Sequence, residues 1–580
     1  MFFARAREKG DAPFLWRKTA GSWTALSWTE VAHQVAALAA ALKAQGLQAG
    51  DPVMLVSENR PEFCIADLAI MAAGCVTVPT YTTNTTRDHQ HILTDSGARA
   101  VIVSTAKLAQ ALMPAVLRSQ ASFVVGMEPL RGAQGNIRCH LWADLIGSHI
   151  ADPAACAAEQ TARREELACV IYTSGTGGAP RGVMQHHGAI LCNIEGAGRL
   201  VVEDFGWGDE VFLSFLPLSH AYEHSGGQFL PIMLAGQIYY AEGLEKLASN
   251  IEEARPTIMV VVPRLFEVLR ARIIKSIEKQ GKFPTWLLGQ ALRIAAKEQN
   301  GRKSAADLPM KLLLARTLKP KIAKRFGGRM KALVSGGAPL NPDVGLFFDA
   351  MGLTLLQGYG QTEAGPVVSC NRPRAGIAMD TVGPPLDGVE VKIAEDGEIL
   401  VRGELVMHGY WRNPSETEKA LKNGWLHTGD IGEIDGKGRI RITDRKKDLI
   451  VNDKGDNVSP QKIEGILTLR PEIGQAMVHG DRRPYLVGLL APDAEWTREW
   501  AAARGLAAEA AVGDPAYQAA LRAAVDRVNE ELSLTERVRR FILTDEPFTI
   551  DNGEMTPSMK IRRHVIRARY QDRLDALYKT

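Results

Sequence analysis

Short apolar runs alternate with longer helical stretches through the first half of the chain. Each run is continuous and rich in β-branched residues, which is typical of a strand buried on both faces. The Ala-rich stretch Trp28–Gln45 is one of the predicted helices between them. Strands that alternate with helices predict an α/β fold with parallel sheets, whose ligand sites lie in the loops after the strands. The predicted strands are Pro52–Val56, Arg99–Ser104, Leu167–Tyr172, Val211–Phe215 and Thr257–Val262.

The pattern changes twice further along the chain. From Arg264 to about Arg325 it is mostly helical, with lysines, arginines and Trp286 among apolar residues. This segment predicts amphipathic helices that pack on the main body, or else a surface that meets membrane lipid or an acyl chain. After Thr381, alternating runs separated by glycine turns predict antiparallel β structure. These runs are Val389–Ile393, Glu398–Arg402 and Gly438–Thr443.

A polar run, Thr443–Asp448, lies between two apolar strands and marks a predicted domain boundary. We therefore predict a large multi-lobed N-terminal domain, residues 1–444, in which a β subdomain follows the parallel sheets. Residues 445–580 form a small α+β domain of ordinary size. Within it, the Ala-rich segment Trp496–Leu521 is predicted as a surface helix.

Composition excludes several classes of protein. The net charge of +3 over 580 residues, without a long basic run, gives no support to nucleic-acid binding. The seven cysteines are scattered and form no CxxC pair, so a zinc site is not predicted and a reducing compartment is. The N-terminus lacks the apolar stretch of a signal peptide, and no apolar run approaches a membrane span. We predict a cytoplasmic protein, with peripheral membrane contact and oligomeric state left open.

The strongest chemical motif follows the predicted strand Leu167–Tyr172. Hydroxyls at Thr173, Ser174 and Thr176, a glycine at Gly175 and the cation of Arg181 suit a polyphosphate. Glycine lets backbone N–H groups approach closely, hydroxyls donate hydrogen bonds and the guanidinium supplies charge. The alternative is a polar surface loop, which is less compatible with a preceding strand and a following cation.

Commoner nucleotide and nucleophile motifs do not fit this loop. It contains no GxxxxGK[ST] match, and Pro180 occupies the position of the third glycine of a GxGxxG fingerprint. The chain also has no GxSxG nucleophile elbow. The sequence therefore predicts a phosphate loop of another kind.

Two later glycine-rich segments also follow predicted strands. The first contains Gly336, Gly337 and Ala338; the second runs from Gln357 to Glu363. Small residues beside an aromatic ring form a slot for a flat base, with Tyr359 as the stacking face and Gly360 next to it. Thr362 and Glu363 offer oxygen ligands for Mg²⁺. Taken alone, Tyr359 also fits a core position, and Glu363 a solvated surface acid.

Two charged residues near the boundary complete the set. Asp430 follows a tight turn, where its carboxylate could accept hydrogen bonds from a ribose diol, and Arg445 lies in the polar boundary run. Taken alone, Asp430 could simply cap its turn and Arg445 could be a surface cation.

In this order, the segments resemble the adenylate-forming superfamily of acyl- and aryl-CoA synthetases, luciferases and peptide-synthetase adenylation domains. The resemblance covers nearly the whole chain and implies ATP, Mg²⁺ and coenzyme A as small-molecule partners. It implies nucleotide binding by the residues named above, a metal at Glu363 and a catalytic lysine at Lys560, in the segment Asn552–Arg563. It also implies a C-terminal domain that is mobile about a hinge at Lys447.

Finer matches are similar to the long-chain fatty acyl-CoA synthetase branch. They include Leu216–Glu223, Val262–Glu267 and Asp444–Ile450. The first of these borders the acyl pocket in the family, which implies a role for His220, although His220 and Tyr222 could equally be core residues. The chain departs from the family at Gly177, where threonine is usual, and at Arg181, where lysine is usual.

The resemblance implies a ligase that converts a long- or medium-chain fatty acid to acyl-AMP and pyrophosphate, and then to acyl-CoA and AMP. Two alternatives stay open. One is an adenylating enzyme that transfers the acyl group to a carrier protein, although the chain shows no carrier domain. The other is a nucleotide- or acyl-binding protein that has lost catalysis, which the glycine at Gly177 would favour.

Overall fold

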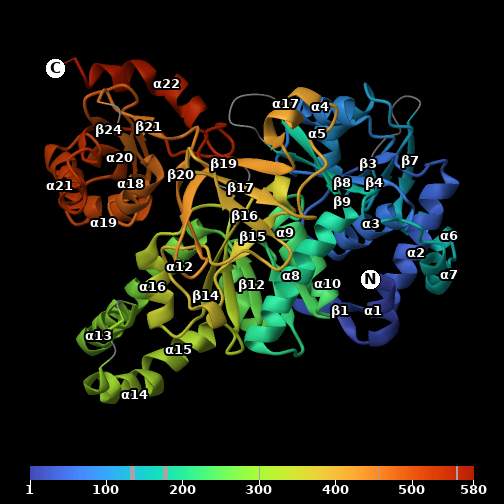
Figure 1. Cartoon of the computed structure of the whole chain (residues 1–580), viewed down its shortest axis with the longest axis horizontal. Coiled ribbons are helices and arrows are strands. Elements are labelled where there is room, and N and C mark those ends of the chain that lie inside the picture. Colours follow the sequence, from blue (N-terminus) through green and yellow to red (C-terminus); the bar gives the residue numbers. More distant parts are fainter. Residues whose placement is uncertain are drawn as a thin grey trace.

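The computed structural model describes residues 1–130, 137–173, 180–299, 301–302, 304–454, 456–556 and 560–579. Within them the chain forms a large body that contains three sheets and a smaller C-terminal body beside it (Figure 1). No helix in these ranges is long and apolar enough to cross a membrane.

The first sheet has seven strands in the order β7–β6–β5–β3–β4–β8–β9. All neighbours are parallel except β8 and β9, which form an antiparallel hairpin. The strands are β3 (Pro52–Val56), β4 (Val76–Thr80), β5 (Ala100–Val103), β6 (Phe123–Gly126), β7 (Arg138–Leu141), β8 (Leu167–Thr173) and β9 (Arg181–His186).

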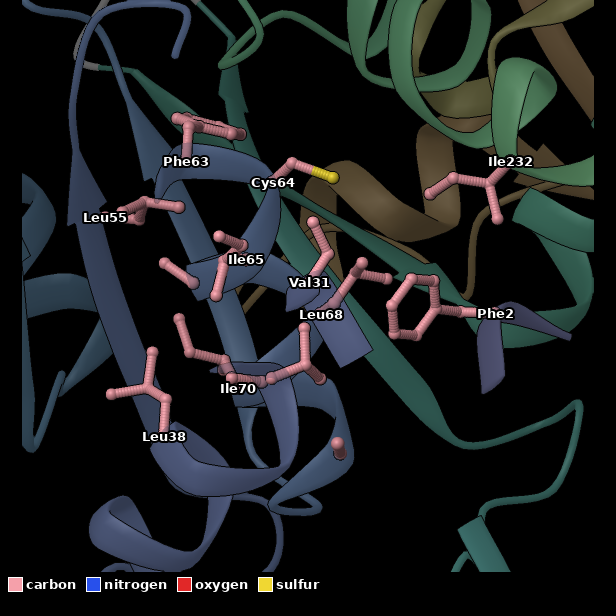
Figure 2. Close-up of a cluster of buried hydrophobic side chains, with 14 of the residues drawn as sticks. Phe2, Val31, Leu38, Leu55, Phe63, Cys64, Ile65, Leu68, Ile70 and Ile232 are labelled. Carbon is pink, nitrogen blue, oxygen red and sulfur yellow. The ribbon is translucent and has the colours of Figure 1, made fainter. Parts of the chain in front are cut away.

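Helices cover both faces of this sheet because its strands are apolar on both sides. In β3, Val53 and Leu55 join one core cluster with α2 (Trp28–Ala44) and α3 (Pro61–Ala72), as Figure 2 shows for Leu55. Met54 and Val56 point to the opposite cluster, with α4 (Thr86–Ser96) and α5 (Ala106–Val116). Helix α2 begins at a capping box in which the Ser27 hydroxyl accepts from the Glu30 N–H.

The second sheet has eight strands in the order β15–β14–β13–β12–β10–β11–β1–β2. Its six inner strands are parallel, and β2 and β15 are antiparallel edges. The strands are β1 (Pro13–Thr19), β2 (Ser22–Ser27), β10 (Val211–Ser214), β11 (Gln237–Tyr240), β12 (Ile258–Val261), β13 (Ala332–Ser335), β14 (Leu355–Gly360) and β15 (Val367–Cys370).

One face of this sheet packs on helices from the segment 263–350. These helices are α12 (Pro263–Glu278), α13 (Lys282–Gln299), α14 (Leu308–Arg316), α15 (Leu318–Arg325) and α16 (Pro342–Ala350). The other face meets α8 (His187–Phe205) and the π-helix η1 (His224–Phe229). The prediction that residues 264–325 are mostly helical is thus confirmed.

A third, antiparallel sheet closes the large body. It contains β16 (Glu390–Ile393), β17 (Glu398–Arg402), β18 (Leu421–Lys422), β19 (Trp425–Ile434) and β20 (Ile440–Arg445). This sheet confirms the antiparallel structure that the sequence predicts after Thr381. Strand β20 runs through Arg445, one residue past the predicted domain boundary, and we keep residues 1–444 and 445–580 as proposed domains.

The small body has its own hydrophobic core. Its strands are β21 (Ile450–Val451), β22 (Asn457–Val458), β23 (Ile473–His479), β24 (Leu486–Pro492) and β25 (Val538–Leu543). Its helices are α18 (Pro460–Leu467), α19 (Ala494–Ala502), α20 (Ala508–Ala511), α21 (Pro515–Glu531) and α22 (Arg563–Ala576). The strands and the longer helices enclose clusters made of residues from this body.

The single surface helix predicted over Trp496–Leu521 is wrong. Three helices occupy this region, because Gly505 adopts φ +67° after α19 and Asp514 caps a new helix that begins at Pro515. The last of them, α21, buries Tyr517 and Leu521 completely, so it is a core helix on one face.

Candidate active site

A cleft of about 2670 Å³ lies between the two bodies, at the carboxyl ends of β8, β13 and β14. The described residues that the sequence nominated all line it. They are Thr173, Arg181, His220, Gly336, Gly337, Ala338, Tyr359, Gly360, Thr362, Glu363, Asp430, Arg445, Lys447 and Lys560. Ser174, Gly175, Thr176 and Gly177 lie outside the described residues.

The ends of the proposed phosphate loop are joined by the β8–β9 hairpin, in which Thr173 pairs with Arg181. The Arg181 guanidinium lies 4.6 Å from the centroid of the Tyr410 ring and forms an ion pair with Glu416. Both partners lie outside the hairpin, and Glu416 belongs to α17 (Pro414–Ala420). Arg181 is therefore held at the edge of the cleft, where incoming phosphates would compete with Glu416 for its charge.

The small residues beside the cleft are required by close packing. A Cβ atom on Gly336 would lie 2.7 Å from the Tyr222 ring, and one on Gly360 would lie 1.9 Å from the Pro366 carbonyl oxygen. Gly337 adopts φ +83°, which favours glycine. These glycines let the loops and the aromatic side chain of Tyr222 approach closely at the wall of the cleft.

Asp430 is buried, and its carboxylate accepts hydrogen bonds from two side chains. The Tyr359 hydroxyl donates to its Oδ2 at 2.7 Å, and Arg445 Nε donates to its Oδ1 at 3.1 Å. Asp430 and Arg445 face each other in the register of β19 and β20. Burial disfavours the Arg445 charge, yet the carboxylates of Asp430 and its neighbours raise the pKa of Arg445. The two hydrogen bonds thus orient the carboxylate of Asp430 toward the cleft wall formed by β19 and β20.

Glu363 lies in the loop after β14, where the Tyr410 hydroxyl donates to its Oε1 at 2.8 Å. The described residues contain no group of three or more His, Cys, Asp or Glu that could hold a metal ion by themselves. Mg²⁺ usually binds one or two carboxylates together with substrate phosphates. Glu363, with Thr362 beside it, therefore fits a magnesium ion that arrives with ATP better than a resident metal.

Lys560 comes from the small body and faces this set of charges. Water reaches its side chain through the wide cleft, although protein surrounds the cleft on both sides. This enclosure, followed by the charge of Arg445, lowers the pKa of Lys560 to about 8; Asp430 and Glu363 act in the opposite direction. The structure thus brings Lys560 together with Asp430 and Glu363, across the proposed domain boundary.

His220 lies at the N-terminus of the short helix α9 (Ala221–Glu223), where its Nδ1 accepts the Tyr222 N–H at 3.2 Å. Burial, and then the charge of Lys560, lowers the pKa of His220 to about 4. His220 is therefore neutral near pH 7 and can contribute packing or hydrogen bonding but no positive charge.

An apolar cavity of about 70 Å³ lies behind the cleft, between α8, η1 and the eight-stranded sheet. Tyr222, Val334, Val367 and Cys370 line both the cleft and this cavity. The Tyr222 hydroxyl donates to the Val334 carbonyl at 2.9 Å, which holds the ring at the junction. The cavity can take an apolar group, and a long chain would require the surrounding side chains to move.

Sequence reasoning missed Tyr410 and Glu416. The Tyr410 hydroxyl donates a hydrogen bond to Glu363, and its ring lies against the Arg181 guanidinium. Glu416 forms an ion pair with Arg181. The local signal is the helix start Asn413-Pro414 just after Tyr410, which marks a turn but says nothing about a contact with Arg181, more than two hundred positions away.

Comparison with known proteins identifies the class to which this fold and cleft belong. The family model described as AMP-binding enzyme matches residues 2–411, and the model of the AMP-binding enzyme C-terminal domain matches residues 447–580. The chain therefore belongs to the AMP-binding enzyme family.

Relatives match over the full length. The chain is 34% identical to the long-chain-fatty-acid–CoA ligase FadD15 of Mycobacterium tuberculosis, over all of this chain and 96% of that protein. It is 30% identical to long-chain-fatty-acid–CoA ligase 6 of the mouse, over 98% of this chain and 85% of that protein. Among solved structures, the adenylation domain of a Mycobacterium chelonae carboxylate reductase superposes with a TM-score of 0.79 at 22% identity, over all of this chain and 90% of that one. This last likeness confirms the predicted fold.

Proposed function

We propose that this chain is an AMP-forming ligase that joins a fatty acid to coenzyme A through an acyl adenylate. The observation that carries the proposal is the position of Lys560 in the cleft, where the charges of Asp430 and Glu363 act on it, while an apolar cavity lies behind the cleft. The full-length relatives named long-chain-fatty-acid–CoA ligases support a long aliphatic acid as substrate.

The first half-reaction brings two anions together. A carboxylate oxygen attacks the α-phosphorus of ATP, the bond to the bridging oxygen breaks and pyrophosphate leaves. The positive charges of Lys560, near the α-phosphate, and Arg181, near the outer phosphates, reduce the repulsion in the transition state. A magnesium ion held by Glu363 and Thr362 would supply further positive charge when bound.

The second half-reaction transfers the acyl group. The sulfur of coenzyme A attacks the acyl carbonyl, and the electron pair of the broken C–O bond leaves with AMP. Throughout both steps, Asp430 would accept the ribose hydroxyls, while the slot around Gly336, Ala338 and Tyr359 would take the adenine. The small body would turn about Lys447 between the steps, which would withdraw Lys560 from the cleft once adenylation is complete.

Pyrophosphate release over a series of acids tests this function. We expect turnover that requires acid and ATP, rises from acetate toward long aliphatic acids and yields acyl-CoA when coenzyme A is present. Lys560→Ala is the control variant, in which pyrophosphate release should fall sharply. Turnover that is fastest with acetate or benzoate would reject a fatty-acid substrate. Acyl-AMP that passes to a carrier protein but never to coenzyme A would instead favour the carrier-loading alternative.

A further inference from the structure

The segment of residues 409–420 lies against strand β9 and carries two partners of Arg181. Its backbone is tied to the strand by the Trp411 N–H, which donates to the Gly182 carbonyl at 2.7 Å. The segment then turns into α17 (Figure 1), whose N-cap residue accepts the Glu416 N–H at 3.2 Å. The ion pair between Arg181 and Glu416 therefore joins two elements whose positions are fixed by other hydrogen bonds.

The two contacts of Arg181 with this segment use different parts of its guanidinium. The Tyr410 ring meets the face of the group, and a contact of this kind does not occupy the N–H groups. Glu416 instead accepts a hydrogen bond from Nη1. A phosphate oxygen would use the same N–H groups, because guanidinium and phosphate form paired, charged hydrogen bonds. All three side chains line the cleft, so a phosphate that enters it competes with Glu416 and not with Tyr410.

Glu416 keeps positive neighbours when Arg181 turns away. Arg181 bonds its Oε2, whereas Lys419, one turn further along α17, donates to its Oε1 at 2.6 Å. The hydrogen bond from Lys419, followed by the charges of Arg181 and Lys447, lowers the pKa of Glu416. Because Lys419 stays bonded and the Glu416 side chain is 30% exposed, the loss of Arg181 leaves no buried, unpaired charge.

We propose that Glu416 is a positioning residue that competes with the outer phosphates of ATP for Arg181. It gives up the guanidinium when ATP binds and takes it back when pyrophosphate leaves. The exchange rests on the proposed function, in which Arg181 lies near these phosphates.

The competition helps the first product to leave. A cation that stabilises the transition state also attracts the pyrophosphate that the reaction forms, and charged hydrogen bonds from one guanidinium would hold it firmly. The carboxylate of Glu416 stabilises Arg181 once the phosphate site is empty. It therefore shifts the equilibrium toward dissociation of pyrophosphate and limits product inhibition, while it also weakens the binding of ATP.

Titration calorimetry of the full chain with ATP, and separately with magnesium pyrophosphate, tests the competition without turnover. Glu416→Gln removes the charge of the side chain and nearly keeps its shape. We expect the Kd for both ligands to fall about three- to fivefold, as the loss of one partly exposed ion pair predicts. Inhibition of the complete reaction by added pyrophosphate should become stronger by the same factor. If Glu416 only held Arg181 in place, its loss would instead weaken the binding of both ligands.

Two controls separate this competition from a general effect of charge. Glu418→Gln removes the same charge from the same helix, but Glu418 is exposed and lies outside the described lining of the cleft. It should bind both ligands like the wild type. Glu416→Gln in an Arg181→Ala background should give no gain in affinity, because Glu416 acts through Arg181.

Unchanged or weaker binding by Glu416→Gln, with its fold checked by circular dichroism, would overturn the proposal. So would a gain that persists without Arg181. Glu416→Ala should show the same gain, which keeps the test valid if the glutamine variant is unstable. Failure of the proposed function has a different signature: ATP would bind, and Glu416→Gln would bind it more tightly, yet no acid would cause pyrophosphate release.

Discussion

The lowered pKa of Lys560 predicts that adenylation is sensitive to alkaline pH. An ordinary lysine titrates near 10.5, whereas enclosure in the cleft and the charge of Arg445 lower the pKa of Lys560 to about 8. The protonated ammonium is the form that can offset the repulsion between carboxylate and phosphate. We therefore expect the first half-reaction to be constant below about pH 7 and to fall as pH rises through 8.

The size of the fall follows from the two pKa values. With a pKa of about 8, roughly one tenth of the lysine is protonated at pH 9, so kcat/KM for pyrophosphate release should fall about tenfold between pH 7 and pH 9. A lysine at 10.5 would lose almost nothing over the same range. Bound ATP adds negative charge and favours the ammonium, so the limb in kcat should lie at higher pH than the limb in kcat/KM.

Two variants and a second assay isolate this effect. Lys560→Arg keeps its charge at every accessible pH and should abolish the alkaline limb, even if its different geometry lowers the rate. Lys560→Ala should lower pyrophosphate release by roughly 10²–10³-fold, as loss of one preorganised electrostatic contact does. Transfer from synthetic acyl-AMP to coenzyme A should instead rise with pH, because the thiolate is the nucleophile. An alkaline limb that persists unchanged in Lys560→Arg would show that another group causes it.

Three further changes test other parts of the cleft. Asp430→Asn should raise KM for ATP by roughly tenfold or more, since it removes a charged acceptor and leaves Arg445 without its partner; an unchanged KM would remove Asp430 from the ribose site. Arg181→Ala should raise KM for ATP roughly ten- to hundred-fold and Arg181→Lys much less, measured by pyrophosphate release; equal values would exclude Arg181 from phosphate binding. Lys447→Pro should still form acyl-AMP but transfer it poorly to coenzyme A, because proline restricts φ at the proposed hinge; equal loss of both steps would argue against a hinge there.

The sequence predicts the parallel sheets well because their strands are continuous apolar runs. Pro52–Val56 coincides with β3, and Leu167–Tyr172 lies within β8. Burial on both faces leaves such runs without polar residues, so their ends are visible in the sequence. The break in Trp496–Leu521 was harder to see, because alanine favours helix on both sides of Gly505 and Gly513.

The sequence predicts which residues line the cleft better than it predicts which of them contact each other. Most nominated residues lie at the end of a strand or in the loop after one, and this places them at the edge of the fold where the cleft lies. Which side chains touch depends on loops that meet only after folding: Tyr359 reaches Asp430 across 71 positions, and Arg181 reaches Glu416 across 235. The sequence predicted Tyr359 as a stacking face, and the structure adds that its hydroxyl orients Asp430.

The contacts between the two bodies are compatible with the proposed rotation of the small body. The small body has its own core, as is typical of a separate domain. Several contacts across the boundary are polar: Lys275 pairs with Glu495 and Glu499, all of which are more than a third exposed, and Arg264 donates to the Gly474 carbonyl at 3.0 Å. Exposed ion pairs contribute about 0–1 kcal/mol each, so these pairs add little to the free energy that holds the orientation placing Lys560 in the cleft. In the proposed reaction the phosphates of ATP attract Lys560, so departure of the negatively charged pyrophosphate would weaken that attraction and favour rotation of the small body toward the second step.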